Sequence, residues 1–360
     1  SKNWVATGPR WDRTKRFFRV IATSRRTLIF LAWMALVGFA FSSAQIGPFW
    51  LFANGLPLGM IWGIVFTYCE GRRLTEVLTV ILSANFILSS GLAKTFGRWV
   101  LQMGYAEQMM PMLVGAAVFP VLGLALWMLS QIPPPGEEEV QARAAREPMS
   151  AADRRGLLRQ YGVPVSLLVV FYLLLTIIRD VRDNFAVEIW TALGYGGQPE
   201  IFSTTELPVT VVVLLGLGIL YRIQDNYQAL LVNLGISVLG VALLLFTTLG
   251  YSNQLVSPVL WMMVSGVGLF LPYILLNGIL FDRFIAHFRI VGNVGFIMYI
   301  ADATGYLGSV LILLYKHFGA AELSWLPFYM GLCYAGSVLG LLTLVVLLVY
   351  FWRKRTLKVK

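Results

Sequence analysis

Apolar stretches of about 20 residues recur along the whole chain, and they constrain its fold more than any other feature. At a helical rise of about 1.5 Å per residue, such a stretch crosses a bilayer core of about 30 Å. Charged residues make up only 13% of the 360 residues, whereas soluble domains carry about 25%. A membrane β-barrel would instead show alternating segments of about 10 residues. The pattern therefore predicts an all-α, polytopic membrane protein.

We expect about ten transmembrane helices in this chain. The expected spans are 28–46, 48–69, 74–97, 109–130, 164–187, 207–222, 228–250, 257–281, 290–315 and 327–352. Four of them precede, and six follow, a hydrophilic stretch at 131–163 that opens with three prolines and three glutamates. This composition is typical of a solvated linker, and we expect a short amphipathic helix near Ala151–Gln160. The predicted domains are thus a partial N-terminal bundle (1–130), the linker (131–163) and a C-terminal six-helix bundle (164–360).

The positive charges indicate the orientation of these spans. If the amino end lies in the cytoplasm and the spans alternate, 23 of the 28 Lys and Arg residues fall in cytoplasmic segments. This bias matches the positive-inside rule and places both ends of the chain in the cytoplasm. The net charge of +10 then reflects membrane topology, so we expect the lipid bilayer as a partner and no nucleic acid.

Several classes of site are not expected. Cys69 and Cys333 fall within predicted spans, and His287 and His317 stand apart, so neither a disulfide nor a metal site is indicated. A glycine-rich phosphate loop is absent, which argues against an ATP-driven pump. We expect no cofactor and no enzymatic activity, because no cluster of nucleophile, base and acid is visible.

Nine motifs resemble an uncharacterised bacterial family placed within the major facilitator superfamily. They are FANGLPLGMIWG (52–63), EGRR (70–73), SANF (83–86), SGLAK (90–94), RDVRDNF (179–185), EIW (188–190), FDR (281–283), GNVGF (292–296) and ADATGYLGS (301–309). The resemblance covers nearly the whole chain. It implies solute transport across a bacterial inner membrane by two six-helix halves joined by a cytoplasmic linker. The basic start of the chain (1–26) resembles the end of a second span, so we expect two further spans upstream.

Charged residues at membrane depth indicate function, because each costs about 3 kcal/mol on insertion scales. The densest cluster lies near the outer end of the fifth span. It comprises Arg179, Asp180, Arg182, Asp183 and Asn184. Two interpretations remain open: an outer gate at a helix end, or an arginine that binds an anionic solute, since guanidinium groups suit carboxylates and phosphates.

Asp302 is the candidate for proton coupling. It lies about 18 Å into the ninth span, and Tyr299 and Tyr306 flank it on the same helical face. A carboxyl group removed from water favours its neutral form and can hold a proton there. Alternatively, Asp302 is a hydrogen-bonding strut between helices.

The remaining candidates fall into two groups. Polar residues inside the spans are candidate solute contacts: Asn54, Asn85, Lys94, Asn277 and Asn293. For Lys94 the alternative is that its amine only extends to the lipid headgroups. Acid–arginine pairs at the cytoplasmic ends of the second and eighth spans are a candidate gate: Glu70, Arg72, Arg73, Asp282 and Arg283.

The leading hypothesis is a secondary transporter of a small organic solute, more readily anionic, coupled to a proton or another ion or working by exchange. The alternative hypothesis is a membrane scaffold or receptor that reuses the same fold without transport.

Overall fold

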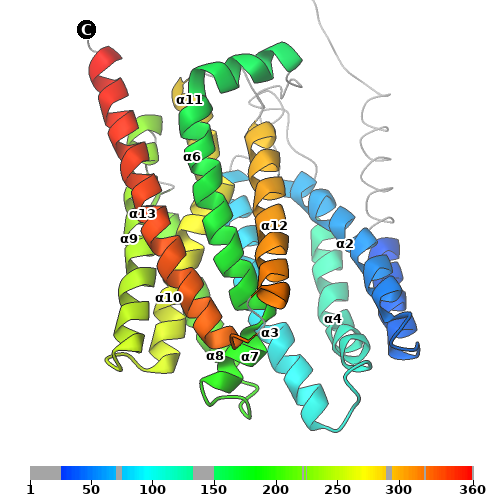
Figure 1. Ribbon diagram of the computed structural model, residues 1–360. Coiled ribbons are helices and arrows are strands. Elements are labelled where there is room, and N and C mark those ends of the chain that lie inside the picture. The colour runs from blue at the N-terminus through cyan, green and yellow to red at the C-terminus, as the bar shows by residue number, and fades with distance from the viewer. Residues whose placement is uncertain are drawn as a thin grey trace, which may run out of the picture. The chain divides into compact units, whose positions relative to one another are not determined.

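The computed structural model describes residues 26–69, 75–132, 150–220, 223, 225–288, 294–319 and 322–358. Throughout these ranges every regular element is helical (Figure 1). The labelled helices are α2 (Gly47–Cys69), α3 (Thr75–Gln102), α4 (Met110–Ser130), α6 (Ala151–Asn184), α7 (Ala186–Ala192), α8 (Ile201–Leu220), α9 (Asn226–Ser252), α10 (Pro258–Leu275), η1 (Leu276–Leu280), α11 (Phe281–Phe288), α12 (Val294–Phe318) and α13 (Trp325–Lys358). A further helix, Arg26–Ala40, precedes them.

Within the described residues, seven helices are long and apolar enough to cross a membrane: α4, α6, α8, α9, α10, α12 and α13. The helix Arg26–Ala40 is also apolar but shorter. The prediction of an all-helical, multi-pass membrane protein is thereby confirmed. Each of the ten predicted apolar stretches overlaps a helix, because length and hydrophobicity are local properties of the sequence.

The chain divides into two compact units. Unit 1 comprises Ser1–Thr75 and Phe96–Arg143, and unit 2 comprises Glu76–Thr95 and Ala144–Lys360. The helix α3 therefore contributes to both units, whereas the predicted domain boundary assigned the whole third span to the N-terminal bundle.

Unit 1 is held together by contacts of the helix Arg26–Ala40. The indole nitrogen of Trp33 donates to the carbonyl of Met112 in α4 at 3.1 Å. The side-chain amide of Asn54 in α2 donates to the carbonyl of Ala32 at 2.8 Å. Asn54, a candidate solute contact, thus connects two helices of unit 1.

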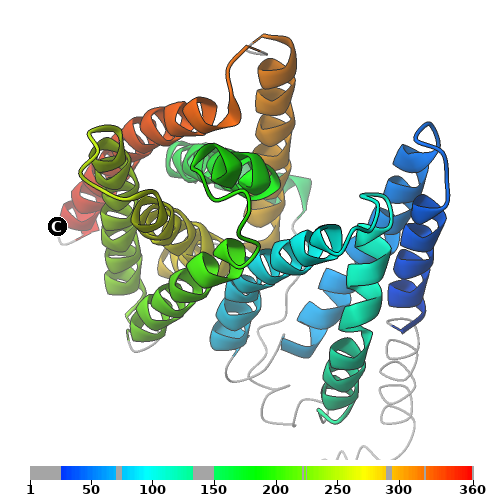
Figure 2. The same cartoon turned by 90° about the horizontal axis from the view of Figure 1, so that it is seen from below.

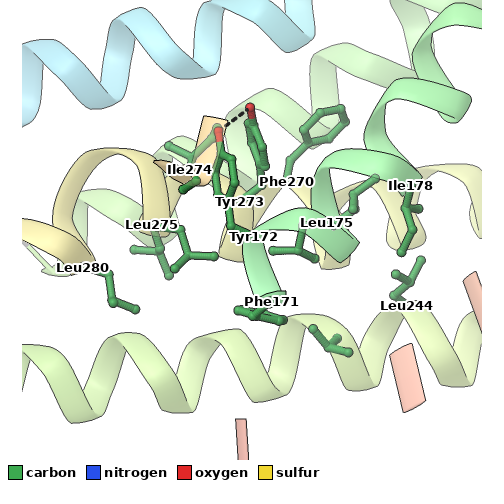
Figure 3. Close-up of a cluster of buried hydrophobic side chains, with 14 of the residues drawn as sticks. Phe171, Tyr172, Leu175, Ile178, Leu244, Phe270, Tyr273, Ile274, Leu275 and Leu280 are labelled. Atoms are coloured by element: carbon green, nitrogen blue, oxygen red, sulfur yellow. Dashed lines mark hydrogen bonds between the residues drawn. The ribbon is translucent and has the colours of Figure 1, made fainter. Parts of the chain in front are cut away.

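The core of unit 2 is built around α6. Viewed from below in Figure 2, the green α6 lies beside the orange α12 and the red α13. Figure 3 shows part of this core, to which Phe171 and Leu175 of α6, Leu244 of α9 and Ile274 of α10 all belong. These side chains surround the polar groups described below with apolar surface.

The N-terminal part of α6 is the helix predicted near Ala151–Gln160. Ser150 caps it: its hydroxyl accepts from the backbone N–H of Asp153, whose carboxylate in turn accepts from the backbone N–H of Ser150. The helix then bends at Tyr161, which has non-helical dihedral angles (φ −124°, ψ 17°). This bend separates the polar first part of α6 from its apolar remainder (Figure 1).

Candidate functional site

The charged residues predicted on α6 are present as ion pairs inside unit 2. Arg179 donates through Nη2 and Nε to one carboxylate oxygen of Asp180, at 2.5 and 3.0 Å. Arg182 donates through Nη2 to Glu206 of α8 at 2.7 Å. Asp183 pairs with Lys94 of α3. Three helices therefore meet through these charges.

The Arg182–Glu206 pair is the most buried of the three. The side chain of Arg182 is only 2% exposed, and its guanidinium lies 5.8 Å from the ring centroid of Phe270. The Nε of Arg182 and the second carboxylate oxygen of Glu206 are buried and have no hydrogen-bond partner. Since removal of either member would leave an unpaired charge in this apolar region, the two residues depend on each other.

Glu206 is absent from the sequence-predicted site. The sixth expected span begins at residue 207, so Glu206 fell just outside it. In the structure α8 begins at Ile201, and Glu206 therefore lies inside the helix. The signal that could have identified it is the apolar pair Ile201 and Phe202 upstream, which are buried in the structure.

Lys94 binds a carboxylate of the protein itself, a contact that was not predicted for it. Its amine contacts Asp183 and the hydroxyl of Ser90, and that hydroxyl donates to Asp183 at 2.5 Å. Gly91 brings α3 close to α8, because a Cβ at this position would lie 2.9 Å from the carbonyl oxygen of Phe202. This close approach brings Lys94 within electrostatic range of Glu206.

We refer to Lys94, Arg182, Asp183 and Glu206 as the charge cluster. It contains two cations and two carboxylates and is therefore formally neutral. Its members differ in access: the side chain of Asp183 is 46% exposed and that of Lys94 22%, against 2% for Arg182. The Lys94–Asp183 pair is thus the part of the cluster that an external molecule could reach first.

A second polar group, the tyrosine network, consists of Asp302, Tyr172, Tyr273 and Arg179. The hydroxyl of Tyr172 donates to the carboxylate of Asp302 at 2.6 Å. The hydroxyl oxygens of Tyr172 and Tyr273 are 3.1 Å apart, and their rings stack with centroids 5.3 Å apart (Figure 3). Arg179 donates to the hydroxyl of Tyr273 and lies over its ring. The network therefore connects α12, α6 and α10.

The hydrogen-bond partner that the structure shows for Asp302 is not one of the two tyrosines predicted to flank it. Tyr299 is 78% exposed and Tyr306 57%, and the hydroxyl that binds Asp302 comes from Tyr172. The helical spacing placed Tyr299 and Tyr306 on the face of Asp302. It carried no information about a partner on another helix, 130 residues away in the sequence.

The other predicted residues are not gathered into either group. Asn85 and Asn184 are exposed, and Asn277 is partly buried within η1. Arg283 of α11 donates to the side-chain oxygen of Asn226 at 3.0 Å, which connects α11 to α9, and Asp282 precedes it in the same helix. Four candidates lie outside the described residues: Glu70, Arg72, Arg73 and Asn293. In the part of the chain that the structure describes, no group of three or more His, Cys, Asp or Glu side chains could hold a metal ion.

Comparison with known protein families identifies the family of this chain, although no curated protein matches it. A sequence profile described as "Family of unknown function (DUF5690)" matches residues 12–354, which is nearly the whole length. The expected membership of an uncharacterised family is thereby confirmed, and the chain belongs to the DUF5690 family.

Proposed function

We propose that the protein is a secondary transporter of the major facilitator type, which moves a small organic solute across a membrane. The observation that supports this most directly is the presence of two polar groups, the charge cluster and the tyrosine network, within apolar helices of unit 2. Ionisable side chains at membrane depth are costly and commonly belong to solute or proton pathways. A scaffold or receptor that only needs a stable bundle gains little from such groups.

Lys94 is the proposed solute contact. Both Arg182 and Lys94 are paired with carboxylates, so an anionic solute can bind only by replacing one of them. Asp183 is far more exposed than the Arg182–Glu206 pair, and its displacement would leave Lys94 available to a solute carboxylate or phosphate. This arrangement favours an anionic solute that competes with Asp183 for the same amine.

Asp302 is the proposed proton-carrying group. Protonation removes its charge while leaving an oxygen that can still hydrogen-bond Tyr172. Coupling to a proton then requires that Asp302 alternates between its charged and neutral forms during transport. A mechanism in which two solutes are exchanged without a proton would not need Asp302.

Uptake into proteoliposomes tests this proposal. Purified protein is reconstituted, a pH gradient is imposed, and a panel of labelled carboxylates, phosphates, amino acids and sugars is screened. We expect gradient-driven accumulation of at least one anionic solute. Asp302→Asn should reduce accumulation at least tenfold while retaining solute exchange at equal pH, and Lys94→Gln should raise the KM at least tenfold.

Leu92→Ala, at an exposed position of the same helix as Lys94, is the matched control and should transport normally. Unchanged uptake in a protein that carries both Asp302→Asn and Lys94→Gln would exclude these residues from the mechanism. Binding of a solute without any transport would favour the scaffold or receptor.

The proposed topology has ten spans in a bacterial inner membrane, with both ends of this chain in the cytoplasm. It is tested with single cysteines in a background of Cys69→Ser and Cys333→Ser. Gln141→Cys in the linker should react with a membrane-impermeant maleimide only after cell lysis. Gln198→Cys, an exposed residue between α7 and α8, should react in intact cells. The opposite reactivity would invert the topology.

A further inference from the structure

We propose that Tyr172 and Tyr273 form a relay that transmits the protonation of Asp302 on α12 to the Arg179–Asp180 ion pair on α6. The inference deepens the proposed function and rests on it, because it names the residues through which a proton would influence the charged groups of the site. Its observable, the orientation of two hydroxyl groups, exists whether or not a solute is present.

The geometry of the tyrosine network is continuous from one end to the other. Asp302 accepts from Tyr172, the two tyrosine oxygens are in hydrogen-bond contact, and Arg179 contacts both Tyr273 and Asp180. Tyr172 and Tyr273 are only 2% and 7% exposed. Because they lie in the apolar core shown in Figure 3, their hydroxyls have little access to water as an alternative partner.

The hydrogen atoms fix the direction of the network when Asp302 is ionised. A tyrosine hydroxyl has one hydrogen to donate and can also accept. Tyr172 uses its hydrogen for the carboxylate of Asp302, so Tyr273 supplies the hydrogen between the two tyrosine oxygens. The oxygen of Tyr273 in turn accepts from Arg179, whose guanidinium can only donate. All donors therefore point from Arg179 towards Asp302.

Protonation of Asp302 reverses this order. The carboxylate takes one proton from hydronium: one O–H bond of the hydronium breaks and leaves water, and one O–H bond forms on Asp302. When the new O–H donates to Tyr172, the hydroxyl of Tyr172 turns to donate to Tyr273. The hydroxyl of Tyr273 must then rotate, so that its hydrogen no longer points at the oxygen of Tyr172. The two hydroxyls therefore reorient together, and Arg179 contacts a Tyr273 oxygen that now also accepts from Tyr172.

The charges of the network change in the same step. Arg179 is one cation, and Asp180 and Asp302 are two carboxylates, so the group carries one net negative charge when Asp302 is ionised and none when it is protonated. The groups that face Asp302 are Tyr172 from α6 and Tyr273 from α10, while Arg179 and Tyr306 interact with Tyr273. From α11, Arg283 is directed towards Asn226 of α9.

Infrared difference spectroscopy of the full chain in lipid bilayers tests the relay. Spectra at high and low pH are subtracted, and ring-deuterated tyrosine identifies the C–O bands of the phenols. The wild type should show a protonated carboxyl band together with a tyrosine signal, and Asp302→Asn should lose both. Tyr273→Phe should halve the tyrosine signal, because the hydroxyl of Tyr172 still responds to Asp302.

Tyr172→Phe is the decisive variant. It should keep the carboxyl band of Asp302 but reduce the tyrosine signal to background, because Tyr273 has lost its connection to the carboxyl group. Tyr315→Phe, at an exposed position of α12, should match the wild type. A Tyr273 signal that persists in Tyr172→Phe, or a wild type without any Asp302-dependent tyrosine signal, would overturn the relay.

The two proposals fail in different ways. Uptake of a solute combined with a persistent Tyr273 signal in Tyr172→Phe contradicts the relay and leaves transport intact. An intact relay signal in a protein that accumulates no solute contradicts transport alone. If Tyr172→Phe does not fold, the other two variants test the relay. The relay requires that the tyrosine signal is halved in Tyr273→Phe and absent in Asp302→Asn.

Discussion

Replacement of Glu206 by Leu is expected to lower the free energy of unfolding by about 3–5 kcal/mol, the range observed when one partner of a buried ion pair is removed. Arg182 would then keep its charge at a position where its side chain is 2% exposed. Its remaining neighbours include the sulfur of Met262, the ring of Phe270 and Tyr329, which are uncharged, and the carboxylate of Asp183, which is already paired with Lys94. Reversible unfolding in mixed detergent micelles measures this loss, and reduced yield of folded protein should accompany it.

A double variant separates the unpaired charge from the loss of packing. Arg182→Met combined with Glu206→Leu removes both charges, and we expect it to recover most of the stability, since apolar replacements of a buried ion pair are often neutral. Glu188→Leu, at an exposed position of α7, is the matched single control and should change stability by less than about 0.5 kcal/mol. A double variant as unstable as Glu206→Leu would show that the pair contributes through something other than charge compensation.

The helices could be predicted from the sequence because each depends on residues close together in the chain. The apolar stretches from 164 to 187 and from 228 to 250 correspond to the apolar parts of α6 and α9. The ends were less accurate where polar residues extend a helix, as Ala151–Gln160 extends α6 and Ile201–Glu206 extends α8. Hydropathy cannot place such ends, because capping by Ser150 and contacts with other helices decide them.

The candidate site could be predicted only in part. The sequence indicated that Arg182 and Asp183 belong to a functional cluster, because charges are costly at membrane depth. It could not indicate the partners, which are 24 residues away at Glu206 and 89 residues away at Lys94. Periodicity on one helix describes a face of that helix, whereas the ion pairs depend on which helices pack together.

Replacement of Gly268 by Ala is expected to destabilise the protein strongly, because it blocks the closest approach of α9 and α10. A Cβ at Gly268 would lie 2.5 Å from the carbonyl oxygen of Gly240 and 2.9 Å from the backbone nitrogen of Leu244. Both are backbone atoms, which cannot rotate away as a side chain could, so the helices must separate. Overpacking of this kind costs about 1–3 kcal/mol, and we expect the upper part of this range. The unfolding experiment described for Glu206→Leu measures it.

The same substitution elsewhere on α9 provides the control. A Cβ at Gly235 would meet no atom within 4 Å, so Gly235→Ala should retain or raise stability, because alanine favours a helix over glycine by about 1 kcal/mol. Gly240→Ala, whose Cβ would lie 2.8 Å from the carbonyl of Gly268, should destabilise in the same way as Gly268→Ala. Helix propensity predicts a gain at all three positions, so losses confined to Gly240 and Gly268 can arise only from the contact between α9 and α10. Equal stability of Gly268→Ala and Gly235→Ala would contradict that contact.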